Sequence, residues 1–492
     1  MAELRVLSAL RLEALAVGGR VQVIGMGPQR ATDAKLRHAD GPVAVAMVGV
    51  AGGVAEGLAA GDLVVATELR TLDGRTRTLA SAELVAVELE RAGLSVHRGP
   101  IVSIPRFARS KERATLGTDG AVAADMESAW LADTLAENLA DLPFAVVRAV
   151  ADSLSGGPVL GGIRALAALR KVRPALEAWA SAAGTRRIEL AAPRSFCAGV
   201  ERAIEIVERA VDRFGAPVYV RRQIVHNAHV VADLERRGAV FVEELDEVPD
   251  GATVVLAAHG VSPEVRGQAA ARPDLSVIDA TCPLVAKVHH EARRFAAQGR
   301  RIVLVGHADH EEVVGTMGEV PDAIDLVERV DDVERLPYGV DTPIAYLTQT
   351  TLAVDETAEI VAALRDRFST LVGPSANDIC YASQNRQDAV RSLAGHCDLV
   401  LVVGSANSSN TARLVEVARR EGCRAELVED AGGVDLRWLV GVDVLGITAG
   451  ASAPEALVTE LVDALSGLGP TEVTEHRTTE ETVRFSLPQQ VR

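Results

Sequence analysis

The 492-residue chain has few aromatic residues and few cysteines, and none of its cysteines lies in a CxxC pair. Aromatic residues make up 3% of the chain and hydrophobic residues 48%, so its cores must be built mainly from Ala, Val and Leu. Structural zinc sites usually take their ligands from closely spaced cysteine pairs, which are missing here. The five cysteines are Cys197, Cys282, Cys380, Cys397 and Cys423.

The chain also lacks an excess of positive charge and a long apolar run. Its formal net charge of −17 argues against a general nucleic-acid or anionic-membrane partner. The first residues, MAELRVLSALRLEALAV, carry charges at Glu3, Arg5, Arg11 and Glu13, which is not typical of a signal peptide. No uninterrupted apolar run reaches membrane-spanning length. We therefore expect a cytoplasmic protein with reduced thiols and no membrane partner.

Residues 1 to about 155 alternate strand and helix patterns, which predicts an α/β domain. Continuous apolar runs are typical of buried parallel strands. They are VQVIGMG (21–27), VAVAMVGVAGG (43–53), DLVVATEL (62–69) and FAVVRAVADS (144–153). Between them lie helical patterns such as SAELVAVELERAG and AADMESAWLADTLAE.

Four motifs in this region appear in an order that resembles the purine-nucleoside phosphorylase and nucleosidase superfamily. They are IGMGPQRA (24–31), VGVAGGVAEGLAAGDLVVA (48–66), AADMESAWLA (123–132) and VVRAVADS (146–153). The resemblance implies that Glu127 holds a ribose and that Asp152 assists the departing base. It also suggests Arg30 as an anion-binding residue and Glu13 as a candidate second acid. The segment between GDLVVA and ADMES shows no clear aromatic stretch for binding a base.

A domain junction is predicted near residue 185. Residues 156–185 read as a closing helix interrupted near Pro174, and a new strand, RRIELAAP, follows. Small and polar residues between two complete apolar patterns are typical of a boundary. We therefore divide the chain into domains at 1–185 and 186–492.

The second domain contains three cysteines at equivalent places in a repeated αβ pattern. Cys197, Cys282 and Cys380 each follow a short apolar run and each begin a helical stretch. The next strand ends 24 positions after Cys282, at Gly306, and also 24 positions after Cys380, at Gly404. Three such units around a pseudo-threefold axis would bring three thiols to one centre.

Several roles are open to three converging cysteines. Zinc lacks the usual paired ligands, and three thiols cannot all form disulfides. An iron–sulfur cluster takes thiolate ligands, and three of them would leave one iron of a [4Fe–4S] cube open. The remaining alternative is that small cysteines simply fill the core. Cys397 and Cys423 lack the repeated layout and are expected to be ordinary core or surface residues.

Polar residues also recur at the strand ends of the three units. A polar group lies 29 positions after Cys197, at His226, and 28 positions after Cys282 and Cys380, at His310 and Ser408. A later strand end in each unit carries His259, Thr350 or Ser452. Histidines and hydroxyls near helix N-termini form a natural pocket for a phosphate or diphosphate. A single such residue is equally well explained as a helix cap.

Motifs across residues 187–488 closely resemble the IspH (LytB) family of 4-hydroxy-3-methylbut-2-enyl diphosphate reductases. They are FCAGVERAI, VYVRRQIVHN, AAHGVSPEV, DATCPLVAKVH, GHADHEEVVGTMGE, LTQTTLAVDET, DICYASQNRQDAV, VVGSANSSNT and TAGASAP. The resemblance implies a pseudo-threefold trefoil of three αβ units around a central [4Fe–4S] cluster held by Cys197, Cys282 and Cys380. Ser195 stands where the family often has Gly, and Asp309 and Glu311 flank His310 as a second departure.

The resemblance also assigns roles around the cluster. Glu312, Thr350 and His310 are the implied catalytic residues, with Glu312 as the proton donor. The implied diphosphate-binding residues are His226, His259, His310, Ser408, Ser409, Asn410 and Ser452. Thr350 and Glu312 would face the hydroxyl end of the substrate.

The implied reaction is the reductive dehydroxylation of the allylic diphosphate to isopentenyl and dimethylallyl diphosphates. This is the last step of the methylerythritol phosphate pathway of isoprenoid biosynthesis. The electrons would come from a ferredoxin- or flavodoxin-like donor. An alternative is a bifunctional protein whose N-terminal domain has nucleosidase or phosphorylase activity. In a third hypothesis only that domain is active, and the cysteine domain is a binding or sensing platform.

Overall fold

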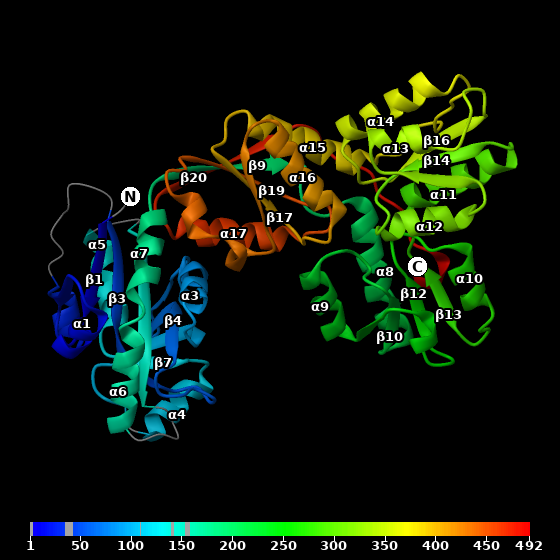
Figure 1. Ribbon diagram of the computed structural model, residues 1–492. Coiled ribbons are helices and arrows are strands. Elements are labelled where there is room, and N and C mark those ends of the chain that lie inside the picture. The colour runs from blue at the N-terminus through cyan, green and yellow to red at the C-terminus, as the bar shows by residue number, and fades with distance from the viewer. Residues whose placement is uncertain (1–2, 35–42, 109, 139–141, 153–157) are drawn as a thin grey trace. The chain divides into compact units, whose positions relative to one another are not determined.

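The computed structural model describes residues 3–34, 43–108, 110–138, 142–152 and 158–492 (Figure 1). The chain forms two compact units. The first comprises Met1–Ile188 with Asp430–Leu445 and Thr459–Thr474. The second comprises Glu189–Glu429, Gly446–Val458 and Glu475–Arg492. The boundary that the sequence suggests at residue 185 stays a prediction.

The first unit is built on an eight-stranded mixed sheet with the order β2-β1-β3-β7-β6-β4-β5, in which β8 pairs with both β3 and β4. Its strands are β1 (Glu3–Ser8), β2 (Val21–Val23), β3 (Val43–Gly53), β4 (Leu63–Thr71), β5 (Thr76–Thr78), β6 (Val96–Ser103), β7 (Ala123–Asp125) and β8 (Phe144–Asp152). The apolar runs at 43–53 and 62–69 therefore form strands as predicted, as do the described residues 144–152 of the third run. The predicted parallel pairing is correct for β3 with β8, whereas β4 is parallel to β6 but antiparallel to β8.

Only the first three residues of the run VQVIGMG form a strand, and β2 is partly exposed. The prediction of a buried strand over 21–27 is therefore wrong. The physical reason is local: Gly25 and Gly27 adopt positive φ angles of 89° and 92°, and Pro28 begins a helix. The chain turns there instead of continuing along the sheet.

Helices cover this sheet, and α6 and α7 run along β1, β3 and β8 (Figure 1). They are separated at residues 170–172, and Pro174 lies in the first turn of α7, which agrees with the predicted interruption. The helices of this region are α1 (Arg11–Val17), α2 (Pro28–Thr32), α3 (Ala82–Arg91), α4 (Ser110–Thr118), α5 (Ser128–Asn138), α6 (Pro158–Leu169) and α7 (Arg173–Ala182).

Three further sheets follow, with the strand orders β11-β10-β12-β13, β15-β14-β16 and β18-β17-β19-β9-β20. All pairs in the first two of these sheets are parallel, as is the pair β17 with β18. The strands are β9 (Arg186–Ala192), β10 (Val218–Arg221), β11 (Ala239–Val242), β12 (Thr253–Leu256), β13 (Ser276–Asp279), β14 (Arg301–Val305), β15 (Ile324–Val327), β16 (Ile344–Thr348), β17 (Leu399–Val403), β18 (Arg424–Val428), β19 (Val444–Ala449) and β20 (Thr471–Arg477).

The helices of this part of the chain follow its strands in an order that recurs along the sequence. They are α8 (Ala198–Phe214), α9 (Ala228–Arg237), α10 (Pro263–Ala270), α11 (Pro283–Ala297), α12 (Glu311–Glu319), α13 (Val330–Arg335), α14 (Val354–Arg367), α15 (Tyr381–Ala394), α16 (Ser409–Arg420) and α17 (Glu455–Ser466). Short 3-10 turns lie at η1 (Leu245–Glu247), η2 (Ala431–Gly433), η3 (Leu436–Leu439) and η4 (Gln489–Val491). The helices α8, α11 and α15 each lead into the strand that stands second in its sheet, namely β10, β14 and β17. The chain thus contains three copies of one αβ arrangement.

Valine, leucine, isoleucine and alanine fill the cores of these sheets, as the low aromatic content predicts. Cys423 is buried in one of these clusters, and Cys397 packs against it. In the part of the chain that the structure describes, no helix combines the length and apolar character needed to cross a membrane.

Candidate functional site

The three repeated cysteines line one cavity, and each is the residue that precedes a helix. Cys197 is the N-cap of α8, Cys282 of α11 and Cys380 of α15. A helix N-terminus carries partial positive charge and unpaired N–H groups, which interact favourably with a negatively charged sulfur ligand. The repeated strand-to-helix turn is therefore what brings the three sulfur atoms to the same cavity.

At Gly199 the cavity wall approaches two of these sulfur atoms closely. A Cβ atom on Gly199 would lie 2.8 Å from Cys282 Sγ and 3.7 Å from Cys197 Sγ, which only glycine avoids. Burial, with a smaller contribution from Cys197, raises the pKa of Cys282 to about 12 and that of Cys380 to about 11. Buried thiols that must share one cavity are stabilised as thiolates by a bound metal centre, which compensates their charge.

Three histidines meet in the same cavity. The rings of His226 and His259 stack with centroids 4.2 Å apart, and His310 meets each of them edge-on at 5.8 Å. Burial and the neighbouring histidine rings lower the pKa of His226 to about 4 and that of His310 to about 3. These rings are therefore neutral near pH 7 in the protein alone, and a bound anion would favour their protonation.

Hydroxyl and amide groups line the cavity beside the histidines. Ser408 Oγ caps the start of α16 by accepting a hydrogen bond from Thr411 N. Ser452 Oγ lies 3.3 Å from Ser408 Oγ. Asn410 accepts a hydrogen bond from Ala451 N and donates one to Ser383 Oγ. The α16 helix begins at Ser409, so this wall of the cavity also contains a helix N-terminus.

Glu312 and Thr350 form a buried pair in the cavity wall. Glu312 is 2% exposed and accepts hydrogen bonds from Thr350 N and from Thr350 Oγ1, both at 2.8 Å. Burial raises the pKa of Glu312 to about 7, although the two hydrogen bonds oppose this rise. A carboxyl group with this pKa holds and releases a proton near neutral pH, as a general acid must.

Every residue that the sequence places in the second-domain site lines this cavity. The three cysteines, Glu312 and Thr350 do so together with His226, His259, His310, Ser408, Ser409, Asn410 and Ser452. The roles given to these residues stay predictions, because proximity shows where side chains lie and not what they do.

Sequence reasoning marked Glu311 as a departure beside His310 but did not predict its contacts. Glu311 Oε2 lies 3.4 Å from His259 Nδ1, and Glu311 Oε1 lies 3.7 Å from Arg222. The contact with His259 lowers the pKa of Glu311 against the effect of its burial. The departure at Glu311 is therefore a contact to a cavity histidine, which only the distance between separate segments could reveal.

Sequence reasoning also missed how the turn before Cys197 is fixed. Ser195 has a φ of 59°, a region that glycine tolerates best, and its hydroxyl donates to Glu455 Oε2 at 2.6 Å. Arg386, fully buried, donates to the carbonyls of Ser195 and Phe196. Glu481 in the C-terminal tail accepts from Arg386, and Phe485 further along the tail lines the cavity.

The first unit has a separate pocket that contains carboxylates. Glu13, Glu127 and Asp152 all line it, as the nucleosidase resemblance implies. Arg30 is not among its lining residues; its side chain lies against Gly25. Phe107, which sequence reasoning did not select, lines the pocket and is 79% exposed. Ser153, the last residue of the motif VVRAVADS, lies outside the described residues.

The three carboxylates have different partners. Glu13 accepts from Leu10 N and Val50 N, and Glu127 accepts from Gly27 N and pairs with Arg148 at 3.2 Å. Asp152 pairs with Arg113 at 2.7 Å. Burial raises the pKa of Glu127 to about 7 even though Arg148 opposes it. This pocket therefore contains one carboxyl group that titrates near neutral pH.

Known proteins resemble the two regions separately. The sequence profile of the LytB protein family matches residues 188–466, and that of the Phosphorylase superfamily matches residues 14–165. A 4-hydroxy-3-methylbut-2-enyl diphosphate reductase of Cutibacterium acnes is 56% identical over 308 residues, which are 62% of this chain and 95% of the relative. One from Azoarcus is 57% identical over 304 residues, with 62% and 97% covered.

A solved structure also resembles this chain. The E-1-hydroxy-2-methyl-but-2-enyl-4-diphosphate reductase from Plasmodium falciparum is 37% identical and superposes with a TM-score of 0.60. The match covers 63% of this chain and 97% of that protein. The LytB profile matches more than half of the residues, and whole relatives align at more than half identity. The chain therefore belongs to the LytB family of 4-hydroxy-3-methylbut-2-enyl diphosphate reductases, and it carries a phosphorylase-superfamily domain at its N-terminus.

Proposed function

We propose that the second unit reduces (E)-4-hydroxy-3-methylbut-2-enyl diphosphate to isopentenyl and dimethylallyl diphosphates, the reaction that its family performs in isoprenoid biosynthesis. The single observation that supports this best is one cavity lined by three cysteines, three histidines and a buried carboxyl group. Each set suits one part of the reaction: electron delivery, diphosphate binding and proton donation.

The cysteines fit the iron–sulfur cluster that the family generally carries. Three thiols at helix N-termini, facing a common space, are a donor set for a [4Fe–4S] cluster with one iron free of protein ligands. When bound, such a cluster supplies electrons and a Lewis-acidic iron. We further propose that the three αβ units surround it with pseudo-threefold symmetry, since each contributes one cysteine from the same turn.

The histidines and hydroxyls suit the diphosphate end of the substrate. His226, His259 and His310 present ring nitrogens to the cavity, and the α16 N-terminus adds Ser408 and Ser409. The pKa values of His226 and His310 are low because these two rings are buried beside other histidine rings, so binding an anion is accompanied by proton uptake at them.

Glu312 suits the role of proton donor to the departing hydroxyl. Thr350 links it to the cavity, because Thr350 Oγ1 donates to Glu312 Oε2 at 2.8 Å. Cleavage of the allylic carbon–oxygen bond takes up two electrons and two protons, and the oxygen leaves as water. The proton reaches that oxygen from Glu312 through Thr350 or a water molecule. The electrons come from an external carrier, for which a ferredoxin- or flavodoxin-like protein is the natural class.

The test is an anaerobic preparation of the full chain. Iron and sulfide are measured, and the diphosphate is then supplied with a reduced viologen dye as the electron source. Cluster-loaded protein should convert the substrate to the two isomeric diphosphates. Full cluster content without substrate consumption would contradict the proposal.

A second activity is favoured by the separate pocket of the first unit. Glu13, Glu127 and Asp152 line one pocket together with the apolar side chains of Met26 and Phe107. Carboxyl groups beside apolar surface suit a nucleoside, whose ribose needs hydrogen-bond acceptors and whose base needs a flat apolar contact. We propose that this unit cleaves the glycosidic bond of a nucleoside.

Release of free base measures this activity. The full chain should release base from a purine nucleoside, and Glu127→Gln should reduce the rate while leaving the reductase rate unchanged. A matched control is Glu68→Gln, which changes a carboxyl group outside the pocket. No base release from a panel of purine nucleosides, with and without phosphate, would contradict the second activity.

A further inference from the structure

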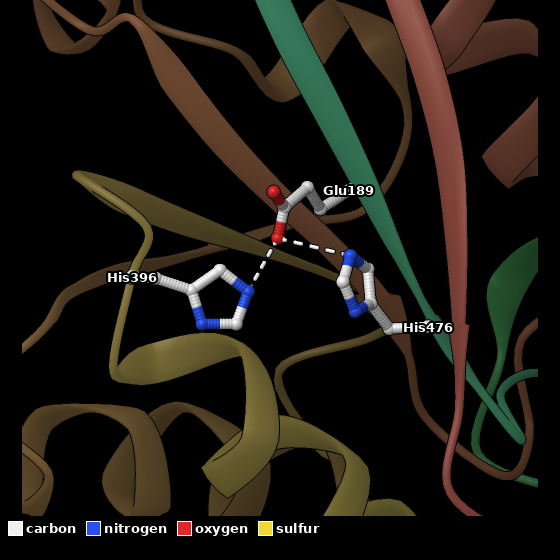
Figure 2. Close-up of side chains that lie close together, drawn as sticks. All are labelled: Glu189, His396 and His476. Atoms are coloured by element: carbon white, nitrogen blue, oxygen red, sulfur yellow. Dashed lines mark ion pairs between the residues drawn. The ribbon is translucent and has the colours of Figure 1, made fainter.

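A second group of side chains of the kind that bind metals lies in the second unit, outside the cysteine-lined cavity. It consists of Glu189 on β9, His396 in the connection from α15 to β17, and His476 on β20 (Figure 2). Their ligand atoms all lie within 4.8 Å of one another. None of the three lines the cavity. The group therefore lies outside the reductase cavity.

Both imidazole rings turn their Nε2 atoms toward the same carboxylate oxygen, as Figure 2 shows. His396 Nε2 lies 2.6 Å from Glu189 Oε2, and His476 Nε2 lies 3.3 Å from it. Two ligands of a tetrahedral zinc ion, each about 2.1 Å from the metal, lie about 3.4 Å apart. His476 already has this spacing, and His396 needs to retreat by less than about 1 Å.

The three side chains differ in how deeply they are buried. The Glu189 side chain is 4% exposed, whereas those of His396 and His476 are 41% and 39% exposed. The carboxylate is thus held inside the fold, and the two rings close over it from the solvent side. An ion can enter from solvent, and the half-exposed rings can adjust around it.

We propose that Glu189, His396 and His476 bind a divalent transition-metal ion, with zinc as the expected occupant. Two imidazole nitrogens and a carboxylate oxygen are an established zinc ligand set, in which water takes the fourth position. The same three donors bind magnesium and calcium weakly, because those ions prefer all-oxygen sites. Cys397 Sγ lies 3.9 Å from Glu189 Oε2, next to the group, and is not one of the three ligands.

The ion would join three segments that are distant in sequence. His476 lies near the end of β20, and two residues later Thr478 N donates to Ala192 O at the end of β9. From there the tail continues to Glu481, which pairs with Arg386 at 3.0 Å, and to Phe485 in the cavity wall. The ion would therefore hold β20 in place, and β20 is the strand from which the C-terminal tail extends to the reductase cavity.

The test uses the full chain with its cluster intact, because empty cluster cysteines would themselves bind zinc. Cluster-loaded protein is equilibrated with zinc chloride and desalted, and zinc and iron are counted in the same sample. The parent should hold one zinc per chain with its iron unchanged. The double variant His396→Ala/His476→Ala should keep its iron and lose the zinc, and Glu189→Gln should weaken zinc binding. Loss of an outer-shell group costs about 10–100-fold in metal affinity, and loss of a ligand should cost at least that much.

The matched control is His290→Ala, which removes an exposed histidine from α11 and should bind zinc like the parent. Cys397→Ser should also retain the zinc. Three results would overturn the proposal: no zinc in a parent with full iron, which would leave an ordinary ion pair; equal zinc in the parent and the double variant; or zinc gained only as iron is lost, which would place the metal at the cysteines.

Discussion

The proposed role of Glu312 as proton donor can be tested with a substitution that removes its acidic proton. Glu312→Gln keeps the size of the side chain and one acceptor for Thr350, but it has no acidic proton. A positioned acid contributes about 10²–10⁴-fold to a rate, so the single-turnover rate should fall within that range while substrate affinity is retained. The matched control is Glu311→Gln, which changes the neighbouring carboxyl group. A Glu312→Gln enzyme that reacts at the parent rate would contradict the assignment.

The pH dependence follows from the raised pKa of Glu312, which is about 7. The acid is protonated below this value and loses its proton above it, so the single-turnover rate of the parent should fall as pH rises through about 7. The measurement is a pH profile of product formation at saturating substrate. In Glu312→Gln this step in the profile should be absent; a step of equal size in the variant would assign it to another group.

The cluster assignment makes a prediction for each cysteine. Cys197→Ser, Cys282→Ser and Cys380→Ser should each lose iron after anaerobic reconstitution, because each removes a sulfur atom from the common cavity. Cys397→Ser and Cys423→Ser change cysteines outside the cavity and should retain iron. Normal iron and activity in Cys282→Ser would refute the ligand set.

At the scale of elements, the first turn of α8 sets the space available between two cysteines. Gly199→Ala places a methyl group 2.8 Å from Cys282 Sγ, closer than the two atoms can approach. The helix or the sulfur must move, so we expect a large loss of bound iron from a protein that still folds. The measurement is iron content together with the far-UV circular dichroism spectrum.

A matched control exists in α10. Gly267→Ala adds the same methyl group to a helix where nothing lies within 4 Å of the new atom. Alanine is more stable than glycine in a helix by roughly 0.5–1 kcal/mol, so this variant should keep its iron and gain slightly in stability. Equal iron in the two variants would show that the close approach at Gly199 does not control the cluster site.

At the scale of the whole molecule, a fragment that starts near residue 186 should fold and retain reductase activity. The LytB profile matches residues 188–466, and the 308 aligned residues cover 95% of the Cutibacterium acnes reductase. The fragment should nevertheless be less stable than the full chain. Segments 430–445 and 459–474 pack in the first unit, where Arg91 donates to Val434 O.

The measurement is the reductase rate and the thermal midpoint of the fragment beside those of the full chain. An insoluble or inert fragment, from a full chain that is active, would show that the reductase needs the N-terminal domain. It would also show that the boundary at residue 185 is misplaced.

The sequence alone determined which side chains line the main cavity. Three cysteines at equivalent positions of a repeated pattern, with histidines and hydroxyls at the later strand ends, are visible because each αβ unit repeats a local strand-to-helix turn. Local hydrogen bonding and apolar spacing dictate such turns. The motifs that carry the family resemblance are likewise continuous stretches of sequence.

The tertiary structure alone decided which distant residues meet and how deeply they are buried. Glu311 contacts His259, and Phe107 enters the N-terminal pocket, without any signal in the surrounding sequence. The raised pKa of Glu312 depends on burial by several segments, and no local pattern encodes it. Glu189, His396 and His476 come from three separate stretches, so their proximity exists only in the folded chain. Distance and desolvation act through space, whereas sequence patterns report only local structure.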